Sequence, residues 1–196
     1  LPDGRPIPVL HGFSRHIIPR PDDWPETSTV TGYWLLDQAE NWDPPQSLTE
    51  FLSSGEAPVY FGFGSIFGRD PRRATRIVLE AIRRTGVRAI LTRGRGGLEL
   101  SDSTQSGSIM FIEAVPHDWL FPQVAAVVHH GGCGTTASGL LAGKPSVICP
   151  FFGDQPFWGR HIARLKVGPS PIPQKTLTVE RLSHAIDIAM NDSTIC

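Results

Sequence analysis

The sequence contains no apolar run that approaches the roughly 20 residues needed to cross a bilayer, so we expect no membrane-spanning helix. It also lacks an excess of charge of either sign, because 18 lysines and arginines face 19 aspartates and glutamates, for a net charge of −1. Without a basic excess, nothing favours nucleic acid or an acidic membrane surface as a partner. The 196 residues, 40% of them apolar, suffice for one large domain or two small ones.

Cysteine is scarce, and the three cysteines are Cys133, Cys149 and Cys196. Their odd number and wide spacing are not typical of a disulfide framework and indicate a reducing compartment, so we expect a cytoplasmic protein. A metal site could draw on Cys133 together with His129, His130 and His161. The sequence has neither a Cys-x-x-Cys nor a His-x-x-x-His pair, however, so we expect no metal ion.

The first 56 residues are rich in proline and tryptophan. Such a density of proline resists both helices and central strands, so we expect mostly irregular structure there, with one short helix from Ser47 to Leu52 that has Ser47 as its N-cap. Apolar residues scattered through this stretch indicate that it packs against other parts of the protein. We therefore interpret residues 1–56 as an interdomain linker together with the end of an N-terminal domain.

Strands and helices alternate from residue 57 onward. Expected strands cover residues 58–63, 87–91, 108–112, 124–129 and 146–149, and expected helices cover residues 71–85, 117–123, 135–142, 155–165 and 179–190. The first of these helices has the clearest ends, with Asp70 as N-cap, Pro71 at the first position and Gly86 just past the end. This alternation predicts a Rossmann-like α/β domain over residues 57–196, with a parallel sheet and helices on both faces. We expect its C-terminal end to be truncated, and its ligands to bind at the carboxyl ends of the strands.

The most informative run is HHGGCGTT at residues 129–136, between an apolar strand and a helix. Glycines allow the backbone to approach a ligand closely, and the free N–H groups of a first helical turn point at it. A tight turn without a ligand is the alternative, but three glycines, two histidines and two threonines exceed what such a turn needs. The run therefore predicts an anion site.

A second glycine-rich loop follows the first expected strand. Gly62 and Gly64 begin a dinucleotide-like G-x-G-x-x-G pattern, but Phe67 occupies the position of the third glycine. Arg93, after the next strand, would suit the extra phosphate of NADP, so an NADP-binding oxidoreductase domain remains an alternative. A loop whose Ser65 faces a phosphate and a plain connecting loop are equally compatible with the pattern.

Two further strand ends carry groups that could bind a ligand. Val115 precedes Pro116, which favours an extended backbone whose N–H and C=O can read the edge of a base. Asp154 and Gln155 stand at a helix start, where an acid and an amide suit the vicinal hydroxyls of a sugar, although Asp154 could instead be only an N-cap. We interpret the aromatic and apolar residues 119–121 as cover for the sheet. A base-reading edge, an anion turn and a hydroxyl-reading pair together predict a nucleotide-sugar pocket.

The runs at residues 129–136 and 150–159 resemble the donor-binding half of UDP-glycosyltransferases with the two-domain GT-B fold, above all sterol 3-beta-glucosyltransferases and related bacterial natural-product enzymes. Residues 12–14, 19–24 and 31–34 resemble that family's interdomain stretch. The resemblance implies a hexosyltransferase that moves glucose from UDP-glucose to a sterol or similar lipophilic hydroxyl, with inversion. A polyketide or macrolide acceptor on the same fold is the alternative.

The resemblance also implies roles for individual residues. The implied donor-binding residues are Ser65, Val115, His130, Gly132, Cys133, Gly134, Thr135, Asp154 and Gln155. In this pattern His130, Ser65 and the N–H groups of residues 132–135 meet the diphosphate, Val115 meets uracil through its backbone, and the 154–155 pair holds the glucose. Plant members carry a glutamate for the ribose where this chain has Ser138, and a tryptophan against uracil where it has Ala114.

In that family the catalytic base is a histidine of the N-terminal domain, and no residue here matches its motif. His11 and His16 lie in the interdomain stretch and are poor candidates. We therefore expect no catalytic residue in this chain, weak binding of UDP or UDP-glucose, and no transfer by the chain alone. The expected partners are a UDP-sugar and, through an N-terminal domain, a lipophilic acceptor, with no separate cofactor. Peripheral membrane association of the full-length protein stays open.

Overall fold

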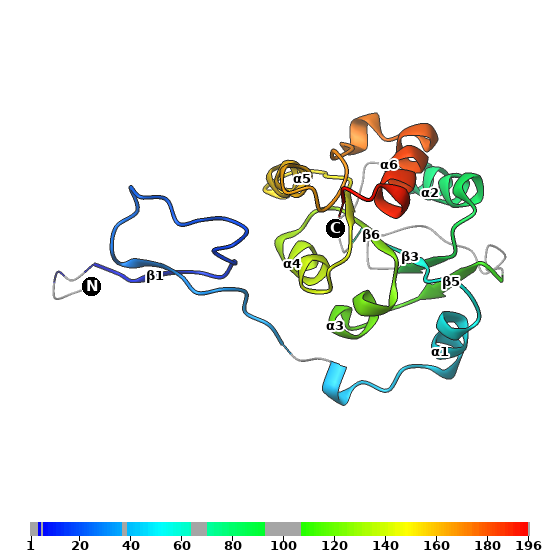
Figure 1. The fold of residues 1–196 in the computed structure, drawn as a ribbon, viewed down its shortest axis with the longest axis horizontal. Helices are drawn as coiled ribbons and strands as arrows, with labels where there is room; N and C mark the ends of the chain where they lie inside the picture. The colour runs from blue at the N-terminus through cyan, green and yellow to red at the C-terminus, as the bar shows by residue number, and fades with distance from the viewer. Residues whose placement is uncertain (1–3, 5, 37–38, 64–69, 93–106, 196) are drawn as a thin grey trace. The chain divides into compact units, whose positions relative to one another are not determined.

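A computed structural model describes residues 4, 6–36, 39–63, 70–92 and 107–195. The chain divides into two compact units, Leu1–Asp37 and Gln38–Cys196, which are described separately (Figure 1). Within the described residues, no helix combines the length and the apolar character that a membrane crossing requires. The assignment of residues 1–56 to a connector between domains stays a prediction.

The first unit contains two short parallel strands that the proline-rich sequence did not lead us to expect. β1 (Val9–His11) pairs with β2 (Ser28–Val30), with Val9 opposite Ser28. Each strand has only three residues, and Pro8 stands immediately before β1, where a missing N–H does not interrupt the ladder. The prolines of this stretch therefore do not prevent strand formation.

The loop between β1 and β2 is held by a single arginine. The Arg20 guanidinium donates to the backbone oxygens of Trp24 at 2.6 Å, Pro25 at 3.0 Å and Ser28 at 3.2 Å. The Trp24 ring also stacks on the His11 ring, with centroids 4.0 Å apart. A guanidinium has five donors in a fixed plane, which suits it to gather several carbonyls of one loop.

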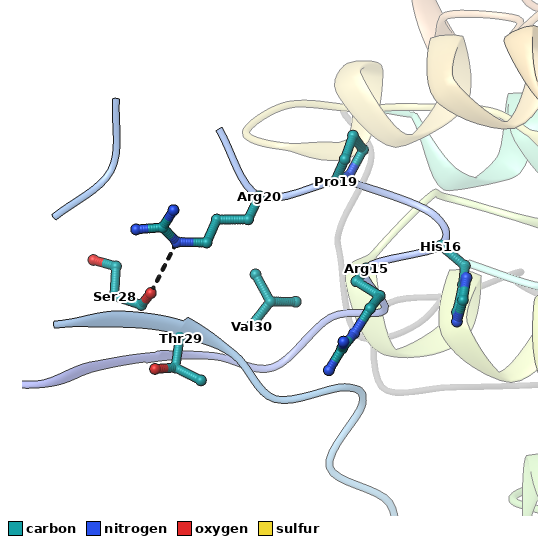
Figure 2. A pocket seen from close by; sticks show the side chains of 7 residues that line it. All are labelled: Arg15, His16, Pro19, Arg20, Ser28, Thr29 and Val30. Atoms are coloured by element: carbon teal, nitrogen blue, oxygen red, sulfur yellow. Dashed lines mark hydrogen bonds between the residues drawn. The ribbon is translucent and has the colours of Figure 1, made fainter. Parts of the chain in front are cut away.

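A cavity of about 590 Å³ lies in this unit between residues 15–20 and β2. Figure 2 shows the Arg20 side chain turned toward Ser28, whose carbonyl it contacts. Because this guanidinium is already bound to carbonyls, the cavity offers Arg15 and His16 as its remaining basic side chains. It belongs to the first unit alone and contains none of the predicted donor-binding residues.

The second unit is built on one five-stranded sheet in the order β5-β4-β3-β6-β7, and every neighbouring pair is parallel. The strands are β3 (Val59–Gly62), β4 (Ala89–Thr92), β5 (Ile109–Ile112), β6 (Ala126–His129) and β7 (Ser146–Ile148). Each lies inside the range that the sequence predicted or within one residue of it. The predicted parallel α/β sheet is thus confirmed.

Helices cover both faces of this sheet, as expected (Figure 1). They are α1 (Gln46–Ser53), α2 (Pro71–Thr85), α3 (His117–Leu120), α4 (Cys133–Leu141), α5 (Gln155–Arg164) and α6 (Val179–Asn191), with 3-10 turns η1 (Ala39–Asn41), η3 (Phe121–Gln123) and η4 (Gln174–Thr176). The predicted ends of α2 are confirmed, since the Asp70 carboxylate accepts from Arg73 N at 2.9 Å and Gly86 has φ 70°. Ser47 as an N-cap is wrong, because α1 begins at Gln46 after Pro45 and has no side-chain cap.

Side chains along each strand alternate between the two faces of the sheet and pack into two apolar layers, one on each face. In β3, Val59 and Phe61 face α2 and α6, while Tyr60 faces the layer formed with α1 and α3. Strands buried on both faces read as continuous apolar runs, which is why the sequence showed no period-two pattern here. Leu120 and Phe121 are fully buried in the second layer, so the interpretation of residues 119–121 as cover for the sheet is confirmed.

The strand order reverses between β3 and β6. From β3 the chain proceeds outward to β4 and β5, and then returns to add β6 and β7 on the other side. In open parallel sheets, ligands bind at the carboxyl ends of the strands where the order reverses in this way. The register pairs Gly62 with His129, so the last residues of β3 and β6 lie side by side. The turn at residues 129–136 thus starts at the predicted binding edge.

Candidate functional site

The turn after β6 ends in the N-terminus of α4. Gly132 is the N-cap with an extended backbone (φ −63°, ψ 144°), and α4 begins at Cys133, two residues before the expected start at Thr135. Thr136 N donates to Gly132 O at 2.9 Å and closes the first turn, so the amides of residues 133–135 precede the helical hydrogen-bond ladder. Free amides at the positive end of a helix form an anion site.

Close contacts constrain two glycines of this turn, Gly131 more strongly than Gly132. A Cβ on Gly131, which has φ +89°, would lie 2.6 Å from Ile148 Cγ2 and 3.2 Å from Gln155 O. A Cβ on Gly132 would lie 2.5 Å from the His130 ring. The run of glycines therefore reflects the approach of the turn to β7, to α5 and to its own histidine.

His129 lies at the base of the turn and is fully buried. Its Nδ1 accepts a hydrogen bond from Gly131 N at 3.0 Å, while its Nε2 has no hydrogen-bond partner among the described residues. Burial lowers the pKa of the His129 imidazole to about 3, with smaller contributions in the same direction from His130 and His117. The ring is therefore neutral at physiological pH.

His130 is half-buried, and its ring is perpendicular to that of His129 with centroids 6.1 Å apart. Burial lowers the pKa of the His130 imidazole, while the Gly62 carbonyl and the Asp154 carboxylate oppose this shift. A neutral imidazole can donate one hydrogen bond to an anion without bringing a charge of its own. His130 thus lies among the end of β3, its own turn and the start of α5.

Cys133 occupies the first position of α4 and is half-buried. Burial raises the pKa of its thiol, and Asp154 acts in the same direction, so the protonated thiol is favoured. Cys149 is fully buried, and burial raises its pKa to about 12. Neither cysteine therefore has the thiolate character of a nucleophile or a metal ligand. Across the described part of the chain, no three histidine, cysteine or acidic residues are grouped to hold a metal ion.

Asp154 and Gln155 begin α5, but their side chains act differently. Asp154 occupies the N-cap position of α5, but its exposed carboxylate accepts from Trp158 Nε1 at 2.9 Å and makes no capping hydrogen bond. Gln155 is buried, and its Oε1 accepts from Phe151 N at 2.7 Å and Phe152 N at 3.3 Å. This oxygen stabilises the turn after β7, which leaves Asp154 as the better placed acceptor for a ligand hydroxyl.

A polar cluster at the same edge of the sheet went unnoticed in the sequence. The Tyr60 hydroxyl lies 3.3 Å from Thr92 Oγ1 and 3.4 Å from His117 Nε2, and the His117 ring stacks on Phe121 with centroids 4.3 Å apart. Burial raises the pKa of Tyr60 and lowers that of His117. Tyr60 and Thr92 resemble ordinary strand residues in the sequence. Tyr60 is the second residue of β3 and Thr92 the last of the adjacent β4, so only the strand pairing brings the two hydroxyls together.

Most of the predicted site residues lie along one edge of the sheet. The Asp154 carboxylate affects the pKa values of both His130 and Cys133, so it lies within electrostatic range of both side chains. Val115 is half-buried just after β5, and three strand spacings separate β5 from β6, or roughly 14 Å. A ligand that meets both must therefore be elongated along the strand ends. Ser65 lies outside the described residues, as do the rest of its loop and Arg93.

Comparison with known proteins identifies the relatives of the chain. Residues 79–196 match the family model described as "Erythromycin biosynthesis protein CIII-like, C-terminal domain". A sterol 3-beta-glucosyltransferase of Arabidopsis thaliana is 45% identical over 189 residues, covering 96% of this chain and 30% of that protein. A sterol 3-beta-glucosyltransferase of Emericella nidulans is 42% identical, covering 95% of this chain and 14% of that protein. The chain thus spans less than a third of these relatives.

The fold has a counterpart among solved structures. The crystal structure of the glycotransferase of kitacinnamycin superimposes with a TM-score of 0.76 at 24% identity, covering 95% of this chain and 47% of that one. This likeness confirms the predicted fold, one half of a GT-B architecture.

Proposed function

Because the chain belongs to the family of erythromycin biosynthesis protein CIII-like C-terminal domains, we propose that it is the donor-binding half of an inverting glycosyltransferase that moves glucose from UDP-glucose to a sterol. The observation that carries this proposal is the anion turn at residues 129–136, which lies at the switch point of the sheet and beside Asp154. The names and the 42–45% identity of the sterol glucosyltransferases support a sterol as the acceptor.

In this proposal the turn stabilises the departing diphosphate. The amides of residues 132–135 at the N-terminus of α4 would face the phosphates, and the side chains of His130 and Ser65 would add further contacts to them. Negative charge grows on the diphosphate as the bond to the sugar breaks, so donors fixed beforehand favour the transition state. A metal ion is not needed for this stabilisation.

The two ends of the donor would meet different elements. Val115 would read uracil through its backbone, and Asp154 would accept from glucose hydroxyls, with the Gln155 amide beside it. Ser138, which replaces the plant family's ribose-binding glutamate, donates its hydroxyl to Gly134 O at 3.1 Å inside α4. The ribose hydroxyls would therefore need another partner along this edge of the sheet.

The other half of the reaction would come from an N-terminal domain. That domain would supply the catalytic base and the lipophilic acceptor, and it would decide between a sterol and a natural-product acceptor. Cytoplasmic location and peripheral membrane association of the full-length protein belong to the same proposal. They would bring the soluble donor and a membrane-resident acceptor together.

Calorimetry with UDP and NADP tests the proposal directly. We expect this chain to bind UDP weakly, to show no measurable binding of NADP, and to transfer no glucose from UDP-glucose to a sterol. Binding of NADP without binding of UDP would instead support the oxidoreductase alternative. Measured transfer by this chain alone would refute the view that the base lies in another domain.

Replacing Asp154 with asparagine should separate sugar binding from nucleotide binding. A neutral amide accepts hydroxyl hydrogen bonds less strongly than a carboxylate, so we expect UDP-glucose affinity to fall by about tenfold, equivalent to about 1.4 kcal/mol. UDP affinity should stay within about twofold, because Asn retains an oxygen for Trp158 Nε1. Titrations of both ligands measure the split, and Asp187→Asn, at an exposed position of α6, is the matched control. Equal losses for both ligands would contradict the assigned role.

A further inference from the structure

His129 is completely buried, and its two ring nitrogens differ in their hydrogen bonding. Nδ1 is hydrogen-bonded to the Gly131 amide at 3.0 Å, and Nε2 is buried without a hydrogen-bond partner among the described residues. A buried polar atom without a partner destabilises a fold, so its retention calls for an explanation. Val127, two residues earlier on the same face of β6, shows that a purely apolar side chain suits this layer.

The hydrogen bond determines the tautomer of the ring. Because Nδ1 accepts from an N–H group, the proton of the neutral imidazole resides on Nε2. Complete burial and the neighbouring His130 and His117 keep the ring neutral, so Nδ1 remains an acceptor. The contact with the Gly131 amide is therefore lasting rather than dependent on a favourable protonation state.

That contact determines which way the turn faces. Gly131 has φ +89°, and the ring holds its N–H toward the protein interior, where it is not available to a ligand. The following residues then enter α4 through Gly132, and the amides of residues 133–135 come before the helical hydrogen-bond ladder. Turning one amide inward is what leaves a consecutive set of amides for an anion.

We propose that His129 is a positioning residue of the nucleotide-sugar site, which aims the amides of residues 132–135 at the diphosphate by accepting the Gly131 N–H. The inference rests on the proposed function, and it assigns to the first histidine of the turn a role distinct from that of His130. His129 contacts no ligand in this scheme. Its effect on binding passes entirely through the backbone of the turn.

A pair of substitutions tests the inference, because asparagine and glutamine place their oxygens differently. The Oδ1 of Asn is bonded to Cγ, as Nδ1 of His is, whereas the Gln oxygen lies one bond further out. We expect His129→Asn to keep UDP affinity within about threefold and His129→Gln to lower it by about tenfold, the equivalent of one hydrogen bond to the turn. Calorimetry measures the affinities, and amide exchange at Gly131 should be faster in the Gln variant only.

Controls separate this role from general stability. Val127→Ala, on the same strand and face, should lower the melting temperature and leave the UDP affinity of the folded chain unchanged. If His129→Gln does not fold, His129→Leu provides the same comparison with Asn. Equal UDP affinities in the Asn and Gln or Leu variants would overturn the inference. Absence of UDP binding by the unmodified chain would instead refute the proposed function.

Discussion

Replacing Gly131 with alanine should abolish UDP binding and destabilise the fold by about 2–5 kcal/mol. The left-handed φ of +89° is unfavourable for alanine by about 1–2 kcal/mol. The added methyl group would also stand 2.6 Å from Ile148 Cγ2 and 3.2 Å from Gln155 O, and overpacking of a core adds about 1–3 kcal/mol. Because a backbone oxygen cannot rotate away, the turn itself would have to move. Urea denaturation and calorimetry with UDP measure the two effects.

Two other glycines provide matched controls for this substitution. Gly86 also has a positive φ, of 70°, but a Cβ there meets nothing within 4 Å and lies at the end of α2, so Gly86→Ala tests strain alone. Gly134 lies in the first turn of α4 with ordinary φ and open space, so Gly134→Ala tests the addition of a methyl group near the ligand. We expect Gly86→Ala to cost about 1 kcal/mol without affecting UDP binding. A Gly131→Ala variant that binds UDP normally would show that the turn does not hold the ligand.

The parts of the fold that local chemistry determines could be predicted from the sequence. The ends of α2 follow from Asp70, Pro71 and Gly86, each of which satisfies or avoids a terminal backbone group. The strands follow from apolar runs that only a doubly covered parallel sheet can bury. The anion turn was recognisable because its residue types are unusual together.

Features that depend on tertiary contacts could not be predicted in the same way. The pairing of β1 with β2 depends on residues far apart in the chain and on Arg20, which gathers the carbonyls of the loop between them. The polar cluster of Tyr60, Thr92 and His117 depends on strand register, which the sequence of one strand does not contain.

The start of α4 lies two residues before the start that helix propensity predicts. Glycine disfavours helices, so the sequence placed the helix start at Thr135, after the last glycine of the run. The structure begins α4 at Cys133, because Gly132 takes the N-cap position and Gly134 is tolerated in the first turn. This shift matters for function, since it places the backbone amides of Cys133 and Gly134 at a helix N-terminus.

The side chain of Gln155 also depends on a tertiary contact. The sequence predicted that it binds a sugar, whereas its Oε1 accepts hydrogen bonds from the turn after β7.

Acidification should destabilise the chain well before its carboxylates titrate. The pKa of His129 is about 3 in the folded chain and near 6.5 when unfolded, so between these values the unfolded chain binds a proton that the folded chain excludes. The contribution of neutral His129 to the free energy of unfolding is fully present above pH 6.5. It falls by about 1.4 kcal/mol for each unit of pH below that value. Burial also lowers the pKa values of His130 and His117, which act in the same direction. Urea denaturation at pH 7.0 and 5.0 should therefore differ by at least about 2 kcal/mol.

The His129→Asn variant assigns the acid sensitivity to one residue. Asparagine does not titrate. Between pH 7.0 and 5.0, the free energy of unfolding of the variant should therefore fall by about 2 kcal/mol less than that of the unmodified chain. His184→Asn, which removes an exposed histidine of α6, is the matched control. If the Asn variant keeps the full acid sensitivity, another buried histidine carries it, and His117 is then the next to replace. If the sensitivity disappears while UDP binding persists, one neutral ring both stabilises the fold and orients the turn.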